Sequence, residues 1–148
     1  MKFFSSTQKA YLAGFLDGDG SIYVRIKPNK TYRYGFQVAP SVILFQSSKG
    51  KKNFEKICSM IKLGYLRERN DGVLEYTINR VDAIRKFLLA IQPYLVLKQE
   101  QAKLMLKILS SKEKIKNQKD FIALTKLIAK YAELNYSKKR KNRKEFVY

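Results

Sequence analysis

The hydrophobic positions along the chain change period several times, and each change predicts a different element of secondary structure. Residues 5–16 have apolar side chains at helical spacing after three hydroxyl residues that can cap a helix, and Gly18-Asp19-Gly20 predicts where this helix ends. Residues 21–27 alternate strictly, with aliphatic side chains on one face and Tyr, Arg and Lys on the other. This segment is therefore predicted to be a strand with one buried face and one basic face.

The rest of the chain continues the alternation of helix and strand. The pattern predicts a strand over 34–45, a helix that starts at Ser47 or Ser48, strands over 64–69 and 73–79, a helix over 81–91, and further helices beyond residue 97. Asn70-Asp71-Gly72 is a strong signal for a hairpin between the two later strands. Pro40 indicates a bulge or a sheet edge in the second strand, because proline cannot donate a ladder hydrogen bond.

The order helix, strand, strand, helix, strand, strand, helix predicts an α+β fold, with two similar half-units around one antiparallel sheet. The helices beyond residue 97 are expected to buttress this sheet. Residues 1–135 are predicted to form one domain and 136–148 a basic tail, in which six of the seven residues from 138 to 144 are Lys or Arg. Such a tail is expected to add non-specific attraction to phosphate.

Charge narrows the class of partner. The 148 residues contain 31 Lys and Arg against 12 Asp and Glu, a formal net charge of +19, so the expected partner is a polyanion. The basic residues lie largely in alternating strands and in the tail and do not form one face of an amphipathic helix, which favours nucleic acid over membrane. No apolar run approaches the roughly 20 residues that span a bilayer, so no membrane partner is expected.

Missing residue types exclude several kinds of active site. The chain has no histidine, which excludes Ser-His-Asp and Cys-His catalysis and every nuclease site built on a histidine base. Its single cysteine, Cys58, can form neither an internal disulfide nor a cysteine-rich zinc site. Chemistry in this chain must therefore come from carboxylates, lysines and a hard metal ion.

Two carboxylates stand at the end of the first predicted helix. Asp17 and Asp19 are the only acidic residues among the first 54, and lysines and arginines surround them in sequence. A carboxylate at a helix C-terminus is repelled by the negative end of the helix dipole, and a divalent cation would remove that cost. An ordinary Asp-Gly turn is the alternative. Gly14 and Gly18 lie four residues apart on this helix, which favours close packing against another backbone.

The segment Tyr11-Leu12-Ala13-Gly14-Phe15-Leu16-Asp17-Gly18-Asp19-Gly20 resembles the LAGLIDADG motif of homing endonucleases, because the helix, the small-residue face, the terminal acid and the following basic strand occur in the same order. One copy is present, and the chain length suits the single-motif members, which act as homodimers. The resemblance extends over residues 7–135 and implies the αββαββα fold of that family. In that fold each subunit lays a four-stranded antiparallel sheet, one half of a saddle, in the major groove of DNA.

The same resemblance implies an activity and a cofactor. Such a homodimer cuts both strands of a long pseudo-palindromic DNA target by metal-dependent hydrolysis of phosphodiesters and leaves short 3′ overhangs. Asp19 is implied as a metal ligand, with the Gly18 carbonyl beside it. The ion is Mg²⁺ or Mn²⁺, and Ca²⁺ is expected to support binding without cleavage. The contact between the motif helices of two subunits is assigned to Leu12, Ala13, Gly14, Leu16 and Asp17.

Further site residues follow from the resemblance. Gln46 corresponds to a polar residue that positions water, and Lys98 corresponds to a basic residue near the scissile phosphate. Related chains carry an arginine at the position of Gly50, so Lys49 or Lys51 is expected to replace it. Asp17 is expected to cap or brace the motif helix and not to bind metal.

The free faces of the predicted strands are expected to read the DNA sequence, since arginine suits guanine and glutamine or asparagine suits adenine. A solvated sheet face is the alternative, but several cations with few acids would repel one another without an anion. The residues expected to contact DNA are Tyr23, Arg25, Lys27, Asn29, Thr31, Tyr32, Arg33, Gln37, Ser41, Ile43, Arg67, Arg69, Glu75, Thr77, Asn79, Lys49 and Lys51.

Two other functions stay open from the sequence. One is an RNA maturase, which uses the same fold to bind intron RNA and aid group I intron splicing. The other is a sequence-specific DNA-binding protein without catalysis. Lysine outnumbers arginine 23 to 8 and no targeting segment is visible, so the expected source is an intron-encoded, intracellular product made in a chloroplast or mitochondrion.

Overall fold

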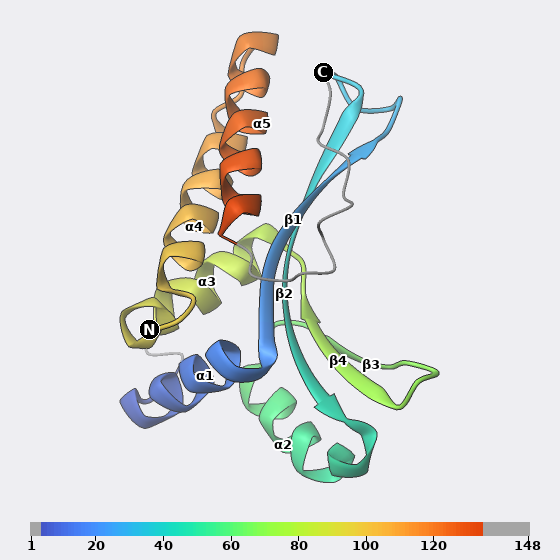
Figure 1. The fold of residues 1–148 in the computed structure, drawn as a ribbon, viewed down its shortest axis with the longest axis vertical. Helices are drawn as coiled ribbons and strands as arrows, with labels where there is room; N and C mark the ends of the chain where they lie inside the picture. The colour runs from blue at the N-terminus through green and yellow to red at the C-terminus, as the bar shows by residue number, and fades with distance from the viewer. Residues whose placement is uncertain (1–3, 135–148) are drawn as a thin grey trace.

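The computed structural model describes residues 4–134, and the helix and strand order within them is the predicted one (Figure 1). The predicted basic tail, 136–148, lies outside the described residues. None of the helices within residues 4–134 is long and apolar enough to cross a bilayer. The elements are α1 (Ser6–Asp19), β1 (Gly20–Pro28), β2 (Phe36–Ser47), α2 (Lys51–Ile61), β3 (Tyr65–Glu68), β4 (Val73–Ile78), α3 (Val81–Ile91), α4 (Gln99–Glu113) and α5 (Gln118–Glu133), with 3₁₀ turns at Ser48–Gly50 and Gln92–Tyr94.

The four strands form one antiparallel sheet in the order β1-β2-β4-β3. β1 and β2 pair without interruption from Gly20 opposite Leu44 to Pro28 opposite Phe36. β4 pairs with β2 only from Val42 onward, so Pro40 lies on a stretch of β2 that has a neighbour on one side alone. The edge predicted from Pro40 is confirmed, and the alternative of a bulge is not, since no register step occurs there.

The end of α1 lies within the predicted stretch Gly18-Asp19-Gly20. The helix includes Gly18 and Asp19 and ends at Gly20, whose N–H donates to the Leu16 carbonyl. A Cβ at position 20 would lie 2.4 Å from Leu16 Cδ1 and 2.9 Å from its Cα, so glycine lets the chain leave the helix directly into β1. The strand therefore starts one residue after Asp19 and fixes where that side chain stands.

The beginning of α2 differs from the predicted start at Ser47 or Ser48. Ser47 caps the 3₁₀ turn of residues 48–50 by accepting a hydrogen bond from Lys49 N at 3.2 Å, whereas α2 itself begins after Gly50 with no side-chain cap. The predicted cap for α1 is confirmed, because Ser5 and Gln8 form a reciprocal capping box.

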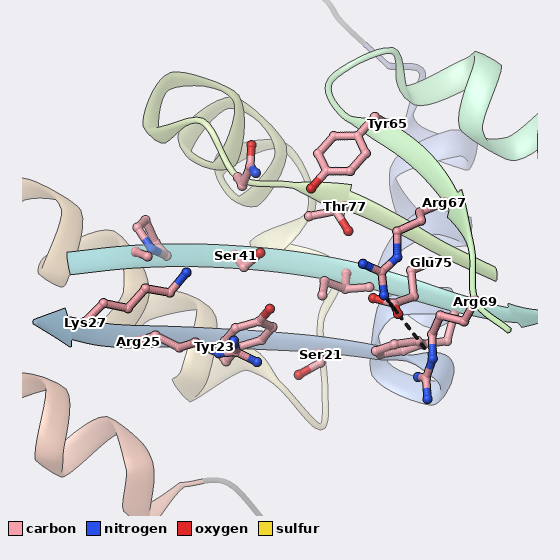
Figure 2. A pocket seen from close by; sticks show the side chains of 15 residues that line it. Ser21, Tyr23, Arg25, Lys27, Ser41, Tyr65, Arg67, Arg69, Glu75 and Thr77 are labelled. Atoms are coloured by element: carbon pink, nitrogen blue, oxygen red, sulfur yellow. Dashed lines mark hydrogen bonds and ion pairs between the residues drawn. The ribbon is translucent and has the colours of Figure 1, made fainter. Parts of the chain in front are cut away.

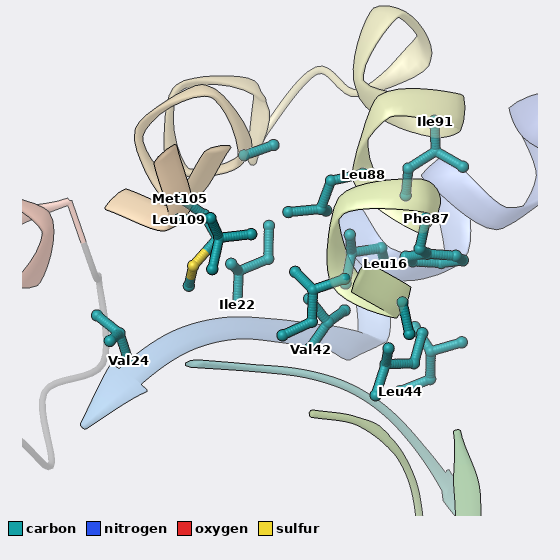
Figure 3. Close-up of a cluster of buried hydrophobic side chains, with 14 of the residues drawn as sticks. Leu16, Ile22, Val24, Val42, Leu44, Phe87, Leu88, Ile91, Met105 and Leu109 are labelled. Atoms are coloured by element: carbon teal, nitrogen blue, oxygen red, sulfur yellow. The ribbon is translucent and has the colours of Figure 1, made fainter. Parts of the chain in front are cut away.

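The hydrophobic core lies between the sheet and the helices, which cover one face of it (Figure 1). Side chains two apart on the strands, such as Ile22, Val24 and Val42, meet Leu88 of α3 and Met105 of α4 in this layer (Figure 3). The other side chains of the strands face away from the helices, and that face of the sheet is concave and uncovered by the described residues (Figure 1). The two-residue alternation thus separates the core face of the sheet from its uncovered concave face.

The β1–β2 hairpin is held against α5 by aromatic stacking. Tyr34 stacks on Phe121 with ring centroids 5.3 Å apart, and Phe36 lies against the same ring at 6.2 Å. The Tyr34 hydroxyl is buried and has no hydrogen-bond partner among the described residues. The Tyr131 hydroxyl on α5, in contrast, donates to the Ile22 carbonyl of β1. The two tyrosine hydroxyls that α5 meets or supplies here therefore have opposite hydrogen-bonding states.

We expect Tyr34→Phe to raise the free energy of unfolding by about 1 kcal/mol, because it removes a buried hydroxyl that lacks a partner. Tyr131→Phe is the matched control and should lower the free energy of unfolding by about 1 kcal/mol, since it leaves the Ile22 carbonyl without its donor. Urea denaturation of the three proteins measures both changes. A loss of stability in Tyr34→Phe as large as that in Tyr131→Phe would contradict the assignment.

Candidate active site and nucleic-acid interface

Asp17 joins the end of α1 to the segment that leads into α4. Its carboxylate accepts hydrogen bonds from the backbone N–H groups of Val96, Leu97 and Lys98 at 2.8, 3.2 and 2.9 Å. Both carboxylate oxygens are therefore in use inside the subunit. These contacts are those of a brace, as predicted, while the placement of Asp17 in the contact between subunits stays a prediction.

Asp19 has a different environment two residues later. Two residues correspond to about 200° around a helix, so Asp19 points away from the loop that Asp17 binds. Its side chain is exposed, and its carboxylate makes no hydrogen bond or ion pair within residues 4–134. The last carbonyls of α1, including that of the exposed Gly18, lie beside it at the negative end of the helix dipole.

This set of donors fits a hard divalent cation. A carboxylate and backbone carbonyl oxygens are the ligands that Mg²⁺ takes, and the site also offers room for water ligands because Gly18 and Asp19 are exposed. Within residues 4–134 no three Asp, Glu or Cys side chains come together. The chain therefore provides a single carboxylate at this position.

Lys98 lies at the same helix end. Its ammonium donates to the Asp17 carbonyl at 2.8 Å. Burial lowers the pKa of Lys98, and the negative charges of Asp17 and Asp19 offset part of that shift. The structure thus brings the predicted pair Asp19 and Lys98 together, although they are far apart in the sequence.

Gln46 lies near the end of β2, two residues after Leu44, which pairs with Gly20 next to Asp19. Its Oε1 accepts a hydrogen bond from Ser47 N at 2.8 Å, so its amide nitrogen is left to donate. A Cβ at Gly50 would lie 3.6 Å from Gln46 Cγ, which shows that position 50 faces Gln46. The arginine expected from the resemblance would stand beside Gln46, and this chain has no side chain there.

The two lysines that flank Gly50 differ in their surroundings. The Lys51 ammonium pairs with Glu68 of β3 at 3.1 Å, with both side chains about half exposed. The Lys49 side chain is exposed and forms no ion pair within the described residues. Lys49 is consequently the freer of the two cations.

The concave face of the sheet forms a groove that contains ten of the residues predicted to contact DNA (Figure 2). Lys27 and Arg25 lie toward one end of this groove, and Arg67 and Arg69 lie toward the other (Figure 2). The ten residues are Tyr23, Arg25, Lys27, Ser41, Ile43, Arg67, Arg69, Glu75, Thr77 and Asn79. Sequence reasoning missed Ser21, Ala39, Pro40, Phe45 and Tyr65, which also line the groove.

Most of the missed residues share the phase of those predicted. Ser21 alternates with Tyr23, Ala39 and Phe45 alternate with Ser41 and Ile43, and Tyr65 alternates with Arg67. Extending each predicted strand face by one step would have found them. Pro40 is out of this phase and is not explained by it.

Three of the predicted residues form the floor of the groove, and their short side chains do not extend from it. Ser41, Ile43 and Thr77 are only 6, 5 and 8 % exposed. Long side chains such as Arg25 and Arg67 stand above this floor and are exposed. The long cations therefore extend furthest from the sheet, and the floor sets how closely a ligand can approach it.

Glu75 organises the cations at one end of the groove. It lies 3.5 Å from both Arg67 Nη2 and Arg69 Nε, and its side chain is 15 % exposed (Figure 2). Arg69 also pairs with Asp71 at 2.6 Å. At the other end the Arg25 guanidinium lies 5.2 Å from the centre of the Tyr23 ring. Four cations against one acid in the groove leave a surface suited to a polyanion.

Apart from Lys49 and Lys51, the predicted contacts outside the groove lie on the β1–β2 hairpin. Asn29 Oδ1 accepts from Thr31 N and Oγ1 at 3.0 and 2.6 Å, which stiffens the hairpin beyond Lys27. Tyr32 and Arg33 are exposed in the same hairpin. Gln37 pairs with Lys27 across the strands and is half-buried. These five positions extend the basic face outward and stay predictions as DNA contacts.

The predicted contact residues of the motif helix require a correction. Leu12, Ala13 and Leu16 are each 0 % exposed, because they form the face of α1 that packs into the core of the subunit itself. Gly14 and Gly18 lie on the opposite face, where an added Cβ would meet nothing within 4 Å. The face of α1 that is open to a second molecule is therefore the glycine face.

Exposed apolar residues adjoin this glycine face. Tyr11 on α1 is 53 % exposed, and Val96 and Leu97, whose N–H groups bind Asp17, are 81 and 69 % exposed. Together they surround the end of α1 with apolar surface that the described residues leave uncovered.

Comparisons with known proteins agree with this architecture. A protein-family model described as LAGLIDADG endonuclease matches residues 12–97. The DNA endonuclease I-CreI of Chlamydomonas reinhardtii is 38 % identical over 138 residues, 93 % of this chain and 84 % of that protein. The DNA endonuclease I-CvuI of Chlorella vulgaris is 37 % identical over 111 residues, 75 % of this chain and 67 % of that protein.

The fold is similar to solved structures of the same group. A crystal structure of the homing endonuclease I-CvuI with the I-CreI target and magnesium, in which the DNA is not cleaved, superposes with a TM-score of 0.84 and 32 % sequence identity, covering 91 % of this chain and 86 % of that one. A second structure holds I-CvuI with its own target and calcium and has a TM-score of 0.83. By sequence and by fold, this chain belongs to the LAGLIDADG endonuclease family.

Proposed function

We propose that the chain is a homodimeric homing endonuclease that binds a long pseudo-palindromic DNA duplex, cuts one phosphodiester in each strand and leaves short 3′ overhangs. The observation that carries this proposal is the exposed, unengaged Asp19 carboxylate at the end of α1, beside a four-stranded sheet whose concave face is cationic. A protein that only bound DNA would gain nothing from an acid placed at a polyanion interface, which favours cleavage over a regulatory role.

Asp19 and the Gly18 carbonyl would hold the metal ion, Mg²⁺ or Mn²⁺. When bound, such an ion lowers the pKa of a water molecule and stabilises the attacking and leaving oxygens of the phosphodiester. Relatives are solved with DNA in the presence of magnesium or calcium. We infer the same use here, with Ca²⁺ supporting binding without cleavage.

The other residues at the helix end position the reactants. The Lys98 ammonium is held by the Asp17 carbonyl and places a positive charge where the phosphate oxygens of the scissile group would lie. The Gln46 amide nitrogen is free to donate to a water molecule, because its oxygen is bound to Ser47 N. Asp17 takes no part in the chemistry. Its carboxylate keeps Lys98 in place by accepting a hydrogen bond from the Lys98 backbone N–H.

A second subunit would complete the site. One subunit brings one Asp19, and close approach of two glycine faces of α1 would bring the two Asp19 side chains to a common axis. The exposed Val96 and Leu97 add apolar surface next to that axis. A two-fold homodimer reads two symmetry-related half-sites, so the target should be pseudo-palindromic.

Two alternatives from the sequence have less support. An intron RNA partner would be compatible with the cationic sheet, but binding of RNA gives no reason for an exposed acid beside it. The organelle remains a proposal supported by the excess of lysine over arginine, 23 to 8, while the relatives come from Chlamydomonas and Chlorella.

Asp19→Asn should remove cleavage and retain binding, since the amide keeps the shape of the side chain and loses the charge that holds the ion. Loss of several kcal/mol of transition-state stabilisation corresponds to a fall in cleavage rate of at least about a hundredfold. Sequencing of cut ends from a duplex library with Mg²⁺ measures cleavage, and a gel shift with Ca²⁺ measures binding. Cleavage at the unaltered rate would refute the role of Asp19.

Gly14→Leu tests the glycine face. Leucine is a better helix former than glycine, so the isolated subunit should be at least as stable, while the bulky side chain should block close approach of two α1 helices. We expect a monomer in analytical ultracentrifugation and no double-strand cleavage. Ala129→Leu, at an exposed position of α5, is the control and should stay dimeric and active. A dimer of Gly14→Leu that cleaves normally would contradict the assignment.

The lysines beside Gly50 can be separated in the same way. Lys49→Ala should lower the cleavage rate about tenfold or more, because its free ammonium is the cation available near Gln46, whereas Lys51→Ala should have a smaller effect since Lys51 is paired with Glu68. Single-turnover cleavage of the target with each variant measures both effects. The reverse order of the two losses would show that Lys51 replaces the missing arginine.

A further inference from the structure

A second basic surface lies beside the edge strand β3, outside the groove described above. Lys62, Arg80 and Lys86 line a hollow there together with one acid, Asp82. All four side chains are exposed, and Arg80 Nη2 pairs with Asp82 Oδ2 at 2.8 Å. We call these three cations the edge patch. Its charge is positive even after the pairing, so it suits an anion.

The edge patch is continuous with the groove. Tyr65, at the start of β3, and Asn79, just after β4, line both the groove and the hollow. Lys62 precedes the start of β3 at Tyr65 and Arg80 follows the end of β4 at Ile78, so the hollow lies just past these strand ends, at the rim of the concave face. A ligand that filled the groove would overhang the edge patch.

The width of the sheet indicates what overhangs it. Four strands at a spacing of about 4.8 Å place the two outer strands about 14 Å apart. The major groove of B-DNA is about 12 Å wide, so a duplex seated with its base edges on the inner strands has its sugar-phosphate backbones over the two rims. We propose that the edge patch binds backbone phosphates of the DNA target, separately from the residues that read bases. This inference rests on the proposed function.

The backbone at Lys62 has a conformation that usually favours glycine. Lys62 has φ 53°, the left-handed conformation, and is the sole residue other than glycine with positive φ within residues 4–134. Glycine is the usual residue at such a helix end, because a Cβ disfavours this conformation. Lysine at this position therefore costs stability relative to glycine, so replacing it with glycine separates the charge of Lys62 from the folding of the segment.

The segment that carries Lys62 is also rigid. The Tyr76 hydroxyl accepts hydrogen bonds from Leu63 N and Gly64 N at 2.9 and 2.8 Å. A Cβ at Gly64 would lie 2.0 Å from the Thr77 carbonyl oxygen, so this backbone is packed directly on β4. Lys62 is thereby held in a fixed place relative to the sheet, as a phosphate contact that sets the register of a duplex requires.

The test compares two charge-matched triple variants of the full chain. One is Lys62→Gly, Arg80→Ala and Lys86→Ala, and the control is Lys103→Ala, Lys107→Ala and Lys126→Ala, whose lysines are exposed on α4 and α5. Fluorescence anisotropy with Ca²⁺ over a range of salt concentrations gives the affinity for the target duplex and for a scrambled duplex.

Loss of the edge patch should lower the affinity for both duplexes by a similar factor of about tenfold or more, because phosphates carry no base identity. The position of the cut should stay unchanged. The slope of log affinity against log salt should become shallower by about 0.9 per lost contact, or up to about 2.7 for each half-site. The control should change neither. An equal loss in both variants would show that only total charge matters and would overturn the inference, as would no loss in either.

Lys62→Gly alone distinguishes charge from folding. It should raise the Tm or leave it unchanged, because glycine suits the left-handed conformation, while it lowers DNA affinity about threefold to tenfold. A fall in both Tm and affinity would assign Lys62 a structural role and overturn the inference. The unaltered chain is measured alongside; failure of that chain to prefer its target would overturn the proposed function itself and the edge patch with it.

Discussion

The three hydrogen bonds from the backbone of residues 96–98 to the Asp17 carboxylate are the constraint on which the site depends. They join two segments about 80 residues apart in the chain, the end of α1 and the start of α4, and they use one of the two acids that the motif provides. Asp19 is thereby left on the other side of the helix, exposed and unengaged, while Lys98 is carried to the same helix end. The two aspartates have similar sequence surroundings and opposite roles, because one is saturated with donors and the other has none.

The sheet fixes the position of this helix end relative to the cationic groove. Gly20 lets β1 start directly after Asp19, so the position of the carboxylate is fixed relative to the strand face. The alternation of side chains then directs the aliphatic residues of β1 into the core, and its other side chains, among them Arg25 and Lys27, into the groove. Glu75 holds Arg67 and Arg69 in place before any ligand arrives, which lowers the entropy lost when these side chains bind a ligand. The region proposed to read DNA and the region proposed to cleave it are therefore separate parts of one rigid frame.

Sequence reasoning predicted the order of elements and the groove because both depend on local periodicity. The bracing role of Asp17 also followed from its position at a helix end. The face of α1 that is free did not, because Leu12 and Leu16 lie on one side and Gly14 and Gly18 on another, and periodicity alone does not show which side the subunit's own core covers. The pairing of Lys51 with Glu68 brings together residues 17 positions apart and depends on the path of the chain between them. Contacts of this kind require the fold.

The central claim is that the active site is shared between two subunits, each of which supplies one Asp19. Its most direct test is a heterodimer of one unaltered subunit and one Asp19→Asn subunit, purified through two different affinity tags and assayed on the supercoiled target with Mg²⁺. The account predicts that this heterodimer binds the target and makes no double-strand break, so that the plasmid stays supercoiled or is cut in one strand. Linear product at the rate of the unaltered homodimer would show that one Asp19 suffices and would contradict the account.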